Sequence, residues 1–162
     1  MIGDPYKRGG PREAYTIPVF KCRLVKERKA LKMAAREIDG AYGAAAVFMR
    51  TLRNLPHEEM HAVYLNAQAE IVGFQVLSVG GLGGTALTPA DVFRGAIAHN
   101  ARAVILGHNH PSGNIAPSPE DISTTVAIRR AGKILGIELL DHLVCAPSTD
   151  RWRSIIDLAP ID

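Results

Sequence analysis

Residues 103–121, AVILGHNHPSGNIAPSPED, decide the fold of this chain. They open with Ala103-Val104-Ile105-Leu106, an apolar run typical of a short strand buried on both faces. The chain passes almost directly into His108-Asn109-His110, and Pro111-Ser112-Gly113 then turn it sharply. The run Ser118-Pro119-Glu120-Asp121 is typical of a helix start, with Ser as N-cap and Pro at the first helical position. We therefore predict a buried strand, a polar loop and a helix, in that order.

The two histidines of this stretch are spaced to bind one ion. Residues two apart at the end of a strand project to the same face, so His108 and His110 point together while Asn109 points away. Asp121, in the first turn of the helix, is placed to supply a third ligand. Two imidazoles and a carboxylate are typical of an open zinc site with a fourth position for water, although Mn²⁺ and Fe²⁺ accept similar ligands. We expect one Zn²⁺ per chain, held by His108, His110 and Asp121.

Two further residue types around this site have candidate roles. Ser118 and Asp121 have the spacing of a capping box, and the serine hydroxyl can at the same time face the metal. Hydrolysis at a metal also needs a carboxylate that takes up a proton, and Glu58 or Glu59 can supply it. In a strand over residues 60–66, alternation places Glu58 on the face of Met60 and Glu59 on the opposite face. The residues alone leave the choice between the two open.

The rest of the chain predicts a mixed α/β domain, a curved sheet with helices packed on it. We expect a glycine-rich loop at 80–84 and a last short element at 152–158. The expected strands are 17–26, 60–66, 70–79, 103–106 and 137–145. The expected helices are 30–55, loosened around Gly40 and Gly43, then 89–100, then one that starts at Ser118 and ends near Gly132 or Gly136.

Length and composition fit one domain of 162 residues. We divide it into a flexible tail at 1–15, a basic strand and helix at 16–57 that pack on the core, and a catalytic core at 58–162. No apolar run reaches the ~18 residues of a membrane span, and the first residues lack the pattern of a signal peptide. We therefore expect a cytoplasmic protein. Cys22 and Cys145 suggest two partly buried thiols and no disulfide framework.

Charge is distributed unevenly along the chain. Residues 1–57 hold twelve Lys or Arg and five acidic residues, a net charge of +7, and residues 58–162 have a net charge of −4. A basic cluster in the first part can contact the phosphates of DNA, although we favour a solvated strand and helix face, because no aromatic residues alternate with the cluster and no nucleic-acid-binding motif accompanies it. The cluster consists of Lys21, Arg23, Lys26, Arg28, Lys29 and Lys32.

The remaining histidines are weaker candidates. Asp141-His142 lies in an otherwise apolar predicted strand, so it either supports the metal ligands from behind or is a hydrogen-bonded pair of the core. We treat His57, His61 and His99 as residues that do not bind the metal.

These motifs together resemble the JAMM metalloprotease family, also called MPN or JAB, and most closely its RadC-like branch. The resemblance covers about residues 17–156. It includes a glutamate, the His-x-His pair, and the serine three residues before the aspartate. The residues that match are Ser78-Val-Gly, Pro89-x-x-Val92-Phe93, 103–106, His108-Asn-His110-Pro-Ser-Gly, Pro117-Ser118-x-x-Asp121 and 131–142.

The resemblance implies a fold, a reaction and a set of roles. The fold is a cytidine-deaminase-like α/β sandwich, and the activity is zinc-dependent hydrolysis of a peptide or isopeptide bond. His108, His110 and Asp121 match the zinc ligands, and Ser118 matches the serine that stabilises the reacting oxygen. The family's glutamate precedes the Asn or Asp at the strand end by eight residues, and Asn66 then selects Glu58 as general base.

Members of this branch often have a helix-hairpin-helix DNA-binding domain ahead of the catalytic one. Residues 1–57 contain no such hairpin, so we expect a catalytic module with a short basic extension. The alternative function is that of a nucleic-acid-binding accessory protein in DNA repair or a mobile element.

Overall fold

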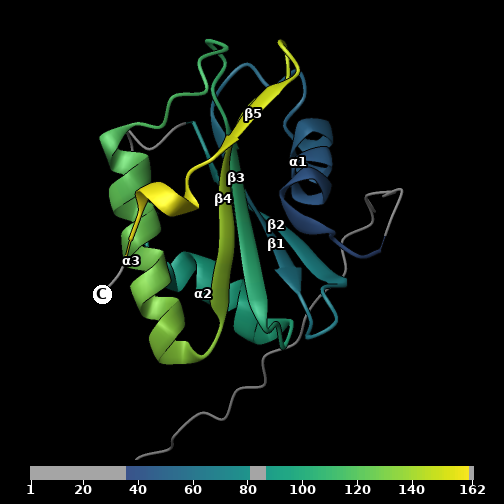
Figure 1. Ribbon diagram of the computed structural model, residues 1–162, viewed down its shortest axis with the longest axis vertical. Helices are drawn as coiled ribbons and strands as arrows, with labels where there is room; N and C mark the ends of the chain where they lie inside the picture. The colour runs from purple at the N-terminus through teal and green to yellow at the C-terminus, as the bar shows by residue number, and fades with distance from the viewer. Residues whose placement is uncertain (1–35, 81–86, 161–162) are drawn as a thin grey trace, which may run out of the picture.

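A computed structural model describes residues 36–80 and 87–160 of the chain, which form one mixed β-sheet with helices on both faces (Figure 1). The strand order is β2-β1-β3-β4-β5; β3 and β4 are parallel and the other neighbours are antiparallel. The strands are β1 (Glu59–Leu65), β2 (Ile71–Val79), β3 (Ala103–Asn109), β4 (Glu138–Ala146) and β5 (Arg151–Ser154). The helices are α1 (Gly40–Thr51), α2 (Pro89–Ala98), α3 (Pro119–Leu135) and the short 3-10 helix η1 (Ile156–Leu158). The predicted mixed α/β architecture is confirmed.

The sheet separates two apolar cores. α1 packs on one face, and α2 and α3 pack on the other (Figure 1). Alternation in β1 divides its side chains between the cores, with Val63 and Leu65 toward α1 and Met60, Ala62 and Tyr64 toward α2 and α3. All seven residues of β3 are buried, as the apolar run at its start predicts.

The unit β3–α3–β4 brings the polar motifs to one end of the sheet. Because β3 and β4 are parallel, α3 must run back along them, and its first turn therefore lies near the carboxyl end of β3. His108 is at this end of β3, and Asp121 is in the first turn of α3. The helix ends at Gly136, whose φ of 68° is a left-handed conformation that glycine adopts without strain.

The helix predicted at 30–55 is shorter than expected. Its described part begins only at Gly40, and the residues before it pair with the β1–β2 turn. Ile38 N donates to Ala69 O at 3.1 Å, and Ile71 N donates to Arg36 O at 2.9 Å. These sheet-type hydrogen bonds override the helical pattern of the sequence.

Several other predictions can be compared with the described residues. The hairpin, the helix after Thr88 and the helix after Ser118 are present, and the strand expected at 103–106 extends to Asn109. The last predicted element consists of β5 and η1. The strand expected at 17–26, the basic cluster, Cys22 and most of the glycine-rich loop lie outside the described residues. Within residues 36–80 and 87–160, no helix combines the length and apolar character that a membrane span requires.

Candidate metal centre

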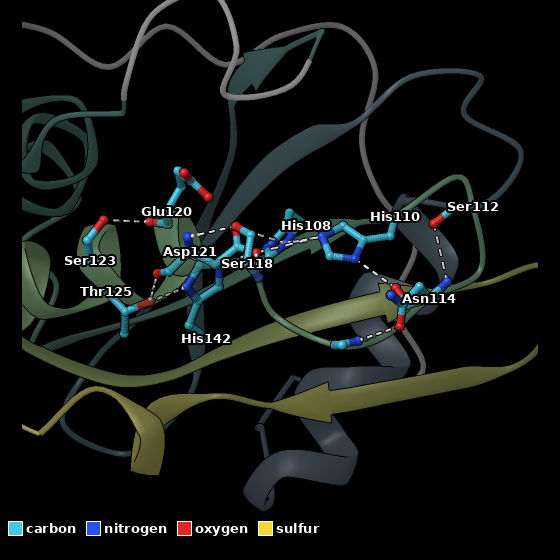
Figure 2. Close-up of polar contacts among 11 residues, drawn as sticks. His108, His110, Ser112, Asn114, Ser118, Glu120, Asp121, Ser123, Thr125 and His142 are labelled. Carbon is cyan, nitrogen blue, oxygen red and sulfur yellow. Dashed lines mark hydrogen bonds and ion pairs between the residues drawn. The ribbon is translucent and has the colours of Figure 1, made fainter.

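The side chains of four predicted site residues meet at the carboxyl end of β3. Glu58, His108, His110 and Asp121 each offer a ligand atom, and these four atoms lie within 4.8 Å of one another. In the part of the chain that the structure describes, this is the one group of three or more His, Cys, Asp or Glu side chains with such spacing. Figure 2 shows His108, His110 and Asp121 of this group, together with Ser118.

The two histidines face each other through the same ring atom. His108 Nε2 lies 3.0 Å from His110 Nε2 and 3.3 Å from Asp121 Oδ1. His110 Nδ1 lies 2.7 Å from the carbonyl oxygen of Asn114, to which it must donate because a carbonyl only accepts. A neutral His110 therefore presents the lone pair of Nε2 to the cluster. Asn114 belongs to the loop between β3 and α3, so the turn chemistry of this loop orients a candidate ligand.

Asp121 is held in place by the start of α3. The Ser118 hydroxyl accepts a hydrogen bond from Asp121 N at 3.0 Å, and Ser118 N donates to Asp121 Oδ2 at 2.7 Å. This is the capping box that the sequence predicts. Because Oδ2 is occupied by the backbone of Ser118, Oδ1 is the oxygen nearer to His108. The Ser118 hydroxyl accepts in this box and keeps its own hydrogen for donation.

Glu58 reaches the cluster through the pairing of β1 with β3. Met60 pairs with His108 in antiparallel register, so the chain just before β1 runs beside the chain just after His108. Glu58 O accepts a hydrogen bond from Gly80 N at 2.8 Å, which joins this segment to the end of β2 as well. Glu59 points elsewhere: its carboxylate lies 3.0 Å from His61 Nε2 and 3.3 Å from His57 Nε2.

Asn109 has a position that sequence reasoning missed. Its side chain does point away from the ligands, but it is 2% exposed and bonds to the segment that contains Glu58. Its Oδ1 accepts from Glu59 N at 2.8 Å, and its Nδ2 donates to His57 O at 3.0 Å. These two hydrogen bonds flank Glu58. No local signal could have revealed them, because they join residues about fifty positions apart.

Behind His108 lies a chain of buried polar contacts. His108 Nδ1 is 2.9 Å from His142 Nε2, and His142 Nδ1 is 2.7 Å from the Thr125 hydroxyl (Figure 2). Burial lowers the pKa of His142 well below its ordinary value, which favours the neutral imidazole. Asp141 instead binds the Ser154 hydroxyl at 2.6 Å, and burial raises the pKa of its carboxyl. Asp141 and His142 therefore have different roles, since only His142 contacts a candidate ligand.

The charge at the site favours a cation. Burial opposes ionisation of Asp121, but when His108 and His110 are protonated, their facing N–H groups outweigh it and hold the pKa of the carboxyl well below its usual range. A metal ion would supply positive charge at the same place as these protons. The same contact with Asp121 raises the pKa of His110, although burial opposes this. Two carboxylates and two imidazoles around one point are a nitrogen and oxygen ligand set that suits a divalent transition metal. The residues present therefore fit a metal ion.

The other histidines do not join this group. His57 and His61 bind Glu59, and His99 Nδ1 donates to Gly95 O at 2.9 Å. A surface depression of about 360 Å³ lies at the other end of the same strands, where Arg102, Lys133 and Glu138 are among its lining residues. It is therefore separate from the candidate metal centre.

Comparison with known proteins agrees with this arrangement. A family model described as the RadC-like JAB domain matches residues 38–157. Relatives named "UPF0758 protein" include one from Staphylococcus carnosus, 39% identical over 121 residues, and one from Moorella thermoacetica, 43% identical over 121 residues. Each match covers 75% of this chain and 53% of the relative, so the chain spans about half the length of these relatives. With its mixed sheet and its Glu-His-His-Asp group, the chain belongs to the RadC-like JAB domain family.

Proposed function

We propose that this chain is a zinc-dependent hydrolase that cleaves an amide bond, in a peptide or at an isopeptide linkage. The observation that supports the proposal most directly is the convergence of Glu58, His108, His110 and Asp121 within 4.8 Å. His108, His110 and Asp121 would hold the zinc ion, and Glu58 would remain beside it as a base. When bound, zinc lowers the pKa of water and polarises a carbonyl group.

Glu58 is proposed to move the proton. Its carboxylate lies beside the metal position, on a segment fixed by Asn109 and Gly80. From there it can accept a proton from the attacking water and donate it to the departing amine nitrogen. The water oxygen bonds to the carbonyl carbon and the C–N bond breaks. One hydrogen of the water passes through Glu58 to the amine nitrogen, and the other leaves with the carboxylic acid product.

Ser118 is proposed to stabilise the carbonyl oxygen as it gains negative charge. Its hydroxyl oxygen accepts from Asp121 N, so the hydroxyl hydrogen is available for donation. A donor fixed by a helix cap requires no reorganisation when charge develops on the substrate.

The test is hydrolysis of peptide and isopeptide substrate libraries by the full chain. We expect cleavage by the zinc-loaded protein, loss of cleavage after chelation and recovery after zinc is restored. Hydrolysis that persists undiminished in metal-free protein would contradict the proposal, as would the absence of cleavage in both libraries by fully zinc-loaded protein.

The alternative function, DNA binding, depends on the basic cluster between Lys21 and Lys32 alone. If this cluster contacts phosphates, affinity for duplex DNA falls steeply as salt rises, because bound counterions are released. Fluorescence anisotropy with labelled duplex at low and high salt measures this. No binding at low salt would remove the alternative.

A further inference from the structure

The polar contacts behind His108 specify which of its two ring nitrogens faces the metal position. A neutral imidazole has one N–H, and only its other nitrogen can bind a metal. We propose that Thr125 and His142 are positioning residues that fix the tautomer of His108, with the proton on Nδ1 and the lone pair on Nε2. The distances between heavy atoms determine the hydrogen positions from Thr125 of α3 to His108 of β3.

The Thr125 hydroxyl determines the tautomer of His142. Its Oγ1 lies 2.6 Å from Asp121 O, one helical turn earlier, and 2.7 Å from His142 Nδ1. The carbonyl oxygen has no hydrogen, so a contact of 2.6 Å requires that Thr125 donates to it. The single hydroxyl hydrogen is then used, and Oγ1 can only accept from His142. His142 therefore has its proton on Nδ1.

The tautomer of His142 in turn determines the tautomer of His108. With its proton on Nδ1, neutral His142 has an unprotonated Nε2 that can only accept. The atom 2.9 Å away is His108 Nδ1, which must therefore donate. His108 then has its lone pair on Nε2, the nitrogen 3.3 Å from Asp121 Oδ1 and 3.0 Å from His110 Nε2.

Burial makes this arrangement rigid. Thr125, His142 and His108 are each 0% exposed, so water cannot replace a lost partner. These polar contacts also return to the candidate site, because the carbonyl group that accepts from Thr125 belongs to Asp121, which is itself a candidate ligand. A ligand on β3 and a ligand on α3 are thus joined through a histidine on β4. The proposal rests on the proposed metal centre but not on the reaction catalysed there.

The direct test measures the tautomers by long-range ¹H–¹⁵N NMR of the full chain, labelled with ¹⁵N, without metal and with zinc. At pH 8, above the ordinary imidazole pKa of about 6.5, we expect the Nδ1–H form for both His108 and His142. A proton on Nε2 of His142 would overturn the proposal. The metal-free sample already reports the tautomers of His108 and His142. The test therefore remains valid even if the chain does not hydrolyse amide bonds.

A second test uses Thr125→Val, which keeps the shape of the side chain and removes the hydroxyl. We expect mixed tautomers of His142 and a zinc affinity about tenfold to a hundredfold weaker by chelator competition, while Thr125→Ser retains both properties. The matched control is Ser154→Ala, which removes the hydrogen bond to Asp141 beside His142. It leaves the contacts of Thr125 with His142 and of His142 with His108 unchanged. Unchanged tautomers and affinity in Thr125→Val, or an equal loss in Ser154→Ala, would overturn the proposal.

Discussion

Glu58 and Glu59 are neighbours in sequence, yet each lies in a different cluster of histidines. Glu59 contacts His57 and His61, and His61 Nδ1 lies 3.2 Å from the Thr51 hydroxyl of α1. Glu58 instead lies with His108, His110 and Asp121 on the side of α3. Both clusters contain a glutamate and two histidines, and the Glu58 cluster also contains Asp121. Each has a buried histidine whose Nδ1 contacts a helix threonine, directly for His61 and through His142 for His108.

The difference lies in how the polar atoms are matched. Around Glu59, each carboxylate oxygen lies opposite one ring nitrogen, so every contact can pair a donor with an acceptor. In the Glu58 cluster, His108 Nε2 faces His110 Nε2, and the contacts behind both rings direct their protons outward. Acceptors that meet without a donor form a binding site for a cation. The pairing of donors with acceptors, together with the additional carboxylate of Asp121, distinguishes the candidate metal centre from the structural cluster.

Changing each glutamate to glutamine is expected to show the largest difference between the two clusters. We expect Glu58→Gln to lower kcat by about 10²–10⁴-fold, because the base is lost while the metal ligands remain. Glu59→Gln should leave kcat within about twofold and lower the free energy of unfolding by about 1–3 kcal/mol, because one histidine loses its acceptor. Steady-state kinetics, zinc content and urea unfolding measure these effects. Equal losses of kcat in the two variants would contradict the distinction.

A second matched pair compares the buried histidines. His108→Ala should weaken zinc binding by more than about a hundredfold, since removal of an outer partner already costs about 10–100-fold. His61→Ala should bind zinc as the unmodified chain does. Competition with a chelator of known affinity compares the two. Stoichiometric zinc in His108→Ala after dialysis would remove His108 from the ligand set.

A third prediction concerns Asn109, which fixes the segment between the two clusters. Asn109→Leu removes both hydrogen bonds that flank Glu58 and leaves His108 and His110 unchanged. We expect kcat to fall by about 10–100-fold through misplacement of the base, with zinc content retained. Asn109→Asp, which keeps the acceptor for Glu59 N, should fall between this variant and the unmodified chain. Loss of zinc in parallel with kcat would show that Asn109 supports the ligands instead.

The smallest expected effect is that of Thr51→Val. The Thr51 hydroxyl contacts His61 as Thr125 contacts His142, but on the side of the sheet opposite the candidate metal centre. We expect the free energy of unfolding to fall by about 1 kcal/mol, with zinc affinity unchanged. Urea unfolding and the chelator competition measure both quantities. A loss of zinc affinity like that expected for Thr125→Val would show that the two threonines are not distinct in role.

The local part of the site could be predicted from the sequence. The spacing of His108 and His110 after an apolar strand, and of Ser118 and Asp121 at a helix start, follows from periods that operate within a few residues. The hairpin and the three main helices also have local signals. The choice of Glu58 over Glu59 required the resemblance to a family, because it depends on how β1 pairs with β3.

The rest depends on contacts between distant residues. Asn109 binds the chain at His57 and Glu59, and His142 binds His108, through sequence separations that no local pattern encodes. The helix predicted from residue 30 begins only at Gly40, because Arg36 and Ile38 pair with the β1–β2 turn. In each case tertiary hydrogen bonds decide between local structures that the sequence alone leaves possible.

The most direct test of a metal centre at the carboxyl end of β3 is the metal content of the purified full chain. Inductively coupled plasma mass spectrometry would be applied to protein made without chelators or a histidine tag. We predict about one zinc ion per chain, as an open site with three protein ligands requires. Absence of zinc that persists after incubation with zinc salt would contradict the metal centre and the hydrolase that depends on it.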